Sequence, residues 1–144
     1  MTIRIEVEGL DRLRKEFSNL DRQFDVAVSD AIEDTALAIR NRIISGIQKG
    51  PKTGQVYEKY NPRRTHRASA PGQPPATDTG RLVGSIYYDI DPMTATVGSR
   101  LVYAQYLEFG TRRMAARPIW IPVANSEGDK LRDRIMANLR RVLP

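Results

Sequence analysis

The pattern of apolar and polar positions predicts a short strand and a short helix at the start of the chain. Ile3, Ile5 and Val7 alternate with charged residues, which is typical of a strand with one buried face, and Gly9 ends it. The next apolar positions recur at spacings of three and four, which favours a short helix over residues 10–20. They are Leu10, Leu13, Phe17 and Leu20.

The longest periodic segment follows, from Asp21 to about Gln48, and predicts a long amphipathic helix. At a rise of 1.5 Å per residue such a helix is about 40 Å long. Gly50 and Pro51 end it, because a glycine just past the last turn and a proline after it are common helix stops. Its apolar stripe consists of Phe24, Val28, Ala31, Ile32, Thr35, Ile39, Ile43 and Ile47.

After Gly80 the pattern becomes β-prone and then helical again. Residues 85–91 and 94–99 predict an antiparallel hairpin that turns at Asp91-Pro92-Met93, and residues 103–109 predict a short helix ended by Gly110. A last helix begins near Pro118, although Pro122 complicates that start, and its pattern is clear from about Ser126 onward. Its apolar stripe is Leu131, Ile135, Leu139 and Val142.

These elements predict an α+β fold in a single domain over residues 1–144. The long N-terminal helix and the C-terminal helix are expected to pack on a small antiparallel sheet. A chain of 144 residues buries a sizeable core but is short for two domains.

Residues 51–78 interrupt this regular pattern with five prolines and almost no aliphatic residue. Loops of this length in a compact domain are usually functional or disordered. Three interpretations stay open: an unstructured linker, an extended arm whose prolines restrict the backbone, or a two-stranded hairpin tip. The segment is basic and its cations are candidates for contact with DNA: Lys52, Lys59, Arg63, Arg64 and Arg67.

Composition narrows the chemistry. There is no cysteine, and His66 is the only histidine, so thiol chemistry and paired histidine acid–base catalysis are excluded. No catalytic triad spacing, phosphate-binding glycine loop or metal-ligand pattern occurs, so we expect no enzyme activity, no cofactor and no metal. No apolar run is long enough to cross a membrane, and the N-terminus lacks the apolar core of a secretory signal, so we expect synthesis in the cytoplasm.

Two blocks carry a more specific signal. The first is Ala68-Ser69-Ala70-Pro71-Gly72-Gln73-Pro74-Pro75-Ala76-Thr77-Asp78-Thr79-Gly80-Arg81-Leu82, with Ser85-Ile86 just after it. The second is Val97-Gly98-Ser99, then Tyr103 to Pro118, which includes Tyr-Ala-Gln-Tyr-Leu-Glu-Phe-Gly-Thr and Met-Ala-Ala-Arg-Pro. In this order and spacing, from about Leu10 to Leu143, the chain resembles the head–tail joining (neck or tail-completion) family of lambdoid, HK-type siphophages.

The resemblance implies a virion protein of the neck, made in the host cytoplasm, which forms a six- or twelvefold ring between head and tail and lets DNA pass. Its expected partners are further copies of itself, the head-completion or connector protein, and the tail-terminator or tail-tube protein. A ring requires one heterologous interface that repeats around the axis. Candidates for that interface are Pro71, Pro74, Pro75, Glu108, Arg112, Arg113 and Arg117.

Two further expectations concern the segments around this interface. Residues 51–78 are expected to become ordered only against a neighbouring subunit. Gly110 is expected to supply a positive φ or a close backbone approach, and Phe109 and Tyr106 are expected to anchor their segment in the core.

Two other function classes remain in view. The net charge of +6 fits a small basic nucleic-acid-binding protein, although the arginines are dispersed and no known DNA-binding motif occurs. A metal-dependent nuclease that uses carboxylates such as Asp89 and Asp91 is the third class.

Overall fold

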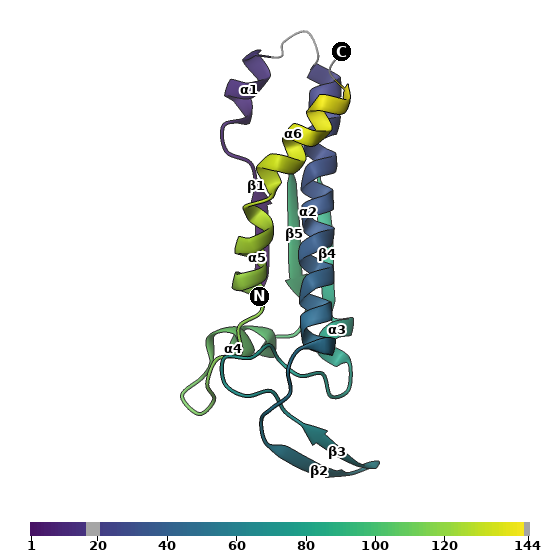
Figure 1. The fold of residues 1–144 in the computed structure, drawn as a ribbon, viewed down its shortest axis with the longest axis vertical. Coiled ribbons are helices and arrows are strands. Elements are labelled where there is room, and N and C mark those ends of the chain that lie inside the picture. Colours follow the sequence, from purple (N-terminus) through teal and green to yellow (C-terminus); the bar gives the residue numbers. More distant parts are fainter. Residues whose placement is uncertain (17–20, 143–144) are drawn as a thin grey trace.

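The computed structural model describes residues 1–16 and 21–142, and it has the α+β architecture that the sequence predicts (Figure 1). The predicted positions Phe17 and Leu20 lie outside the described residues. In chain order the elements are β1 (Thr2–Glu6), α1 (Leu10–Glu16), α2 (Asp21–Lys49), β2 (Val56–Tyr60), β3 (Arg63–Arg67), α3 (Arg81–Gly84), β4 (Ile86–Asp91), β5 (Thr94–Ser99), α4 (Tyr103–Phe109), α5 (Trp120–Gly128) and α6 (Leu131–Val142).

Helix α2 is the axis of an elongated molecule. Every residue of its predicted apolar stripe is buried, and Ile32, Ile43 and Ile47 are fully so. This stripe faces β4 and β5 as well as α5 and α6, so one helix packs against both the sheet and the C-terminal helices. The helix ends where predicted, with the Gly50 N–H bonded to the Gly46 carbonyl.

The main sheet has the strand order β1-β5-β4, and both pairings are antiparallel. The predicted 85–91/94–99 hairpin is confirmed as β4–β5, and β1 is added to it on the β5 side. The central strand buries Ala95 and Val97 under the helices, while Ile5 is the buried position of β1. The helices α2 and α5 cover one face of this sheet, and α6 continues along α2 toward the end that carries α1 (Figure 1).

The C-terminal region differs from the single late helix that the sequence predicts. Two helices form, α5 and α6, with a break at Asp129 and Lys130. Gly128 stands at this break, where its low helix propensity favours an end rather than a continuation. The predicted stripe of α6 is confirmed, with Ile135 and Leu139 buried and Leu131 and Val142 packed against the core.

Residues 51–78 contain the hairpin β2–β3, one of the three interpretations that the sequence left open. The turn between the strands carries a cis peptide bond at Asn61-Pro62. The hairpin lies with α4 at one end of the molecule, and α1 lies at the other (Figure 1). In the part of the chain that the structure describes, no helix is long and apolar enough to cross a membrane.

Candidate assembly interface

The hairpin is held to the rest of the chain by one carboxylate, that of Asp78. Lys59 Nζ lies 2.7 Å from Asp78 Oδ2, Arg64 donates to Asp78 Oδ1, and His66 Nδ1 lies 3.7 Å from Oδ1. The hydrogen bond from Lys59 lowers the pKa of Asp78 most, and that from Arg64 adds to it against the opposing effect of burial. All three basic groups come from β2 and β3, so Asp78 acts as a latch between the hairpin and the segment before α3.

The alternation of side chains along the hairpin explains which residues reach the latch. Tyr57 pairs with His66 and Lys59 with Arg64, and these four share one face of the two strands. The opposite face carries Val56, Glu58, Tyr60, Arg63, Thr65 and Arg67, all exposed. Two of the predicted DNA-facing cations, Lys59 and Arg64, are therefore paired with Asp78 of the same chain. Arg63 and Arg67 lie on the opposite face of the hairpin and point away from Asp78.

The proline-rich segment after the hairpin is tied to two distant elements. The Gly72 N–H donates to the Ala116 carbonyl, and the Thr77 N–H donates to the Ile47 carbonyl at the end of α2. The Arg117 guanidinium donates to the Ser69 carbonyl through Nε (3.3 Å) and Nη2 (3.2 Å). Within one chain these contacts connect residues 51–78 to the end of α2 and to the segment after α4. That the segment becomes ordered only against a neighbouring subunit stays a hypothesis.

Glu108 lies inside the chain and caps α5. Its side chain is 3% exposed, and its carboxylate accepts hydrogen bonds from the backbone N–H groups of Ile119 (2.8 Å), Trp120 (2.9 Å) and Ile121 (2.8 Å). The first N–H groups of a helix have no partner within it, and no side chain at Ile119 caps them. Pro122 comes next and has no N–H to satisfy, which explains why two prolines flank a stable helix start.

Gly110 ends α4, two residues after Glu108. Both reasons that the sequence offered for a glycine here, a positive φ and a close backbone approach, are confirmed. Its φ is 76°, and a Cβ here would lie 2.8 Å from the Met114 carbonyl oxygen. Thr111 and Met114 close the tight turn that follows, with the Thr111 N–H donating to the Met114 carbonyl at 2.8 Å. The turn presents Arg112 and Arg113 to solvent.

Large apolar side chains are exposed at this end of the molecule. The prediction that Phe109 and Tyr106 anchor α4 in the core is wrong: they are 63% and 46% exposed, because α4 buries Ala104 and Glu108 instead. The other exposed apolar residues of α4 and the hairpin are Val56, Tyr57, Tyr60, Val102 and Tyr103. Exposed aromatic side chains that gather at one end of a molecule are candidates for protein–protein contact.

The structure divides the predicted interface residues into accessible and internal ones. Pro71, Arg112 and Arg113 are exposed, and Pro74 is half-buried. Pro75 is buried, Glu108 is occupied as a helix cap, and Arg117 is half-buried on the Ser69 carbonyl. These last three are buried or bonded within the chain, so their role in subunit contact stays a prediction, and Pro71, Arg112 and Arg113 are the exposed candidates.

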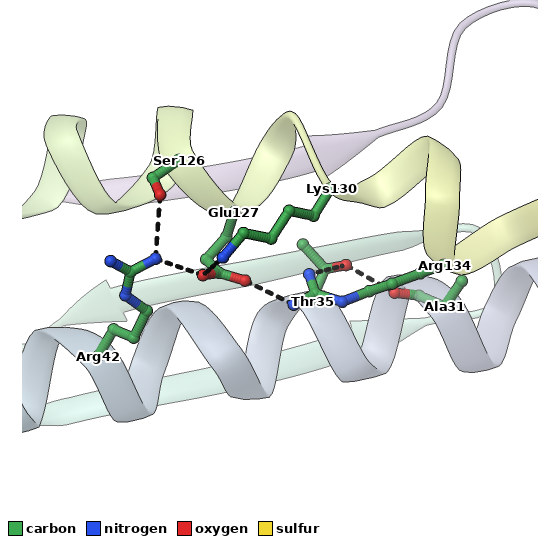
Figure 2. A network of polar contacts seen from close by, with 7 residues as sticks. All are labelled: Ala31, Thr35, Arg42, Ser126, Glu127, Lys130 and Arg134. Atoms are coloured by element: carbon green, nitrogen blue, oxygen red, sulfur yellow. Dashed lines mark hydrogen bonds and ion pairs between the residues drawn. The ribbon is translucent and has the colours of Figure 1, made fainter. Parts of the chain in front are cut away.

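A second buried carboxylate, Glu127, was not singled out by sequence reasoning. It is 2% exposed and accepts from Arg42 and Arg134 at 2.5 Å and from Lys130 at 2.9 Å (Figure 2). Arg134 also donates to Thr35 Oγ1 at 3.0 Å, and Thr35 in turn donates to the Ala31 carbonyl. Burial raises the pKa of Glu127, but the hydrogen bonds from Arg134, Lys130 and Arg42 outweigh it and lower the pKa to about 2.

The spacing of Lys130 and Arg134, three and seven residues after Glu127, was a signal for this cluster. The part played by Arg42, which lies on α2 and is 85 residues before Glu127 in the sequence, carried no local signal. The cluster joins α2, α5 and α6 and lies on the flank of the molecule away from the hairpin (Figures 1 and 2). Arg42, Lys130 and Arg134 all form ion pairs with the one carboxylate of Glu127. Such a cluster stabilises the packing of helices and indicates a structural role.

Comparison with known proteins gives one match. The model of the HK97-gp10-like family, described as "Bacteriophage HK97-gp10, putative tail-component", matches residues 11–110. No curated protein and no solved structure matches the chain. The matched range includes α2, the hairpin, the first block with Asp78, and α4 up to Gly110, while the Met-Ala-Ala-Arg-Pro run and the last two helices lie beyond it. The chain belongs to the HK97-gp10-like family of bacteriophage tail components.

Proposed function

We propose that this chain is a non-enzymatic structural subunit of the phage neck, where copies form a ring that joins the head to the tail and lets DNA pass. The observation that carries the proposal is the family match over residues 11–110, which makes the chain a phage tail component. The ring has six or twelve copies, as the resemblance to head–tail joining proteins implies. The neighbouring layers are a head-completion or connector protein and a tail-terminator or tail-tube protein.

The distribution of surface groups supports an assembly role. A subunit that closes a ring needs two different surfaces that meet on adjacent copies. The end formed by the hairpin, α4 and the turn after Gly110 combines exposed aromatic residues with Arg63, Arg67, Arg112 and Arg113. Aromatic residues and arginine are enriched at the energetic centres of protein interfaces.

A nonsense mutation in the gene tests the proposed function. Infection with the mutant phage in a non-suppressing host is expected to yield DNA-filled heads and complete tails that do not join, visible by electron microscopy. Supplying the chain in trans restores joined particles. Mutant lysates that contain only headless, malformed tails would instead place the chain in tail assembly, and normal joined particles would refute a structural role.

Contact with genomic DNA is a second, weaker element of the proposal. Arg63 and Arg67 on the outer face of the hairpin are the predicted cations that remain exposed. Passage of DNA through a ring calls for few, non-specific phosphate contacts, so affinity for DNA is expected to be low and to fall steeply with salt. A small basic DNA-binding protein is the alternative function. Tight, sequence-selective binding at physiological salt would favour it.

A further inference from the structure

Charge is divided unevenly along the molecule. Residues 49–81 and 100–118, which form the hairpin, the proline-rich segment, α4 and the turn after it, hold eleven lysines and arginines and three acidic residues, whereas the whole chain has 23 and 17. Acidic residues therefore outnumber basic ones in the remainder of the chain. Opposite charges on different parts of one chain give two copies surfaces that attract each other.

The turn after α4 combines unpaired cations with an exposed aromatic ring. Arg112 and Arg113 are exposed, and across residues 1–16 and 21–142 their guanidinium groups have no ion pair or hydrogen bond. Phe109, the last residue of α4, is 63% exposed. We call residues 109–114 the arginine turn. An aromatic ring close to arginines is a composition that protein interfaces favour at their centres.

One face of α2 offers the matching chemistry. Val26, Asp30 and Glu33 are spaced by four and three residues, so they share a face of the helix, which we call the acidic face. All three are exposed, and Val26 is 51% exposed. Among the described residues, neither carboxylate has an ion pair or a hydrogen bond. The sheet, α5 and α6 pack against the buried stripe of α2, so the acidic face is left uncovered.

The two surfaces of one copy lie too far apart to meet. Helix α2 runs from the end that carries α1 to the end that carries the hairpin and α4 (Figure 1). From Glu33 to its last residue, Lys49, the helix is about 24 Å long at about 1.5 Å per residue. This exceeds the screening length for exposed charges, which is about 10 Å at about 0.1 M salt. Contact between the arginine turn and the acidic face therefore requires two copies.

We propose that the arginine turn of one copy binds the acidic face of α2 on the next copy. Arg112 and Arg113 then pair with the two carboxylates of that face, and the Phe109 ring covers Val26. The inference rests on the proposed function, because two different surfaces of one chain form a heterologous interface that repeats around a ring. Contact of the same arginines with DNA is the competing outcome, and it gives the acidic face no role.

Charge reversal tests whether the two surfaces meet. One full-length chain carries Arg112→Glu and Arg113→Glu, a second carries Asp30→Lys and Glu33→Lys, and a third carries all four substitutions. Sedimentation velocity at low salt measures the self-association of each chain. We expect each two-site variant to associate at least about tenfold more weakly than the unmodified chain, because like charges then face each other. The four-site variant is expected to return to within about threefold of the unmodified chain, since the charges are exchanged and attract again.

A matched control reverses two other exposed acids, with Asp89→Lys and Asp91→Lys on β4. It is expected to leave the association of the unmodified chain unchanged and not to rescue the Arg112→Glu/Arg113→Glu chain. A folding defect is not cured by further substitutions, so restoration by the four-site variant identifies the contact itself. No association of the unmodified chain, a four-site variant no better than the two-site variants, or equal rescue by the β4 control would overturn the inference.

The nonsense-mutant phage separates this contact from the proposed function. If the mutant makes joined particles without the chain, the proposed function fails while sedimentation still reports the contact. If joining requires the chain and the four-site variant supports neither association nor joining, the contact fails and the proposed function stands.

Discussion

Glu108 replaces the N-terminal cap that the sequence before α5 lacks. The residue before this helix is Ile119, whose side chain cannot accept a hydrogen bond. A carboxylate eleven residues earlier in the chain accepts instead, and a negative charge at a helix N-terminus is also favoured by the helix dipole. Glu108 thus links α4 to α5 and fixes the loop that carries Arg112 and Arg113.

Glu108→Ala leaves three backbone N–H groups at the start of α5 without this partner. We expect the free energy of unfolding to fall by about 2–3 kcal/mol, measured by urea denaturation. Glu33→Ala, at an exposed position of α2, is the control and is expected to change it by less than about 0.5 kcal/mol. Equal effects of the two substitutions would mean that Glu108 is not a cap.

Glu127 predicts a pH dependence of stability. Its pKa falls from 4.5 to about 2 on folding, so the folded state favours the ionised carboxylate. This stabilisation is fully present above pH 4.5 and is lost as the pH falls through about 2. At about 1.4 kcal/mol per pKa unit it amounts to about 3 kcal/mol. Urea denaturation should show the advantage of the unmodified chain over Glu127→Gln shrinking between pH 5 and pH 2. A constant difference over that interval would contradict the account.

For single residues, the sequence predicted the role of a position only where that role depends on its immediate neighbours in the chain. Gly110 was assigned its positive φ because glycine after a short helix is a common way to leave it. Glu108 and Glu127 were not assigned their roles, because their partners are remote: Ile119–Ile121 for one and Arg42 for the other. Phe109 was wrongly placed in the core because a short helix gives too few turns to identify its buried face.

At the scale of elements, the turn after α4 depends on backbone shape as well as on the cap. Gly110→Ala places a Cβ 2.8 Å from the Met114 carbonyl at a φ of 76°, so the turn must shift. We expect a loss of about 1–3 kcal/mol in the free energy of unfolding. Gly128→Ala is the matched control, since its Cβ meets nothing within 4 Å. Alanine there is expected to be neutral or to stabilise α5 by up to about 1 kcal/mol. The reverse order of the two variants in thermal denaturation would refute this.

The hairpin depends on the Asp78 latch more than on a core of its own. A two-stranded hairpin is marginally stable by itself, and Lys59 and Arg64 hold it through one carboxylate. Asp78→Asn is expected to speed hydrogen exchange of the amides in residues 56–67, while the amides of α2 keep their protection. Asp89→Asn, an exposed carboxylate on β4, should leave the hairpin unchanged. Unchanged exchange in the Asp78 variant would show that other contacts hold the hairpin.

Long periodic elements were predicted well because burial imposes their period. The stripe of α2 and the β4–β5 hairpin follow from spacing alone. The sequence did not decide between three conformations for residues 51–78. Its prolines and charges exclude a core strand there, but they are compatible with a linker, an extended arm or a hairpin. The pairing that selects the hairpin brings Lys59, Arg64 and His66 to Asp78. Lys59 and Arg64 are 19 and 14 residues away from Asp78 in the sequence, so no local pattern indicates these contacts.

At the scale of the whole molecule, an elongated α+β body carries the hairpin and α4 at one end (Figure 1). Aromatic residues and arginines of these elements and of the turn after Gly110 are exposed. The family match makes the chain a phage tail component. The hairpin and α4 belong to the region that the family model covers.

The position of the chain in the phage particle distinguishes a neck subunit from other tail components. Antibodies raised against the chain and coupled to gold, applied to intact particles and to isolated tails, locate it by electron microscopy. A neck subunit is expected to give label at the joint between head and tail, and on the head-proximal end of tails that have been detached. Label confined to the distal tip or spread along the tail shaft would contradict a neck subunit.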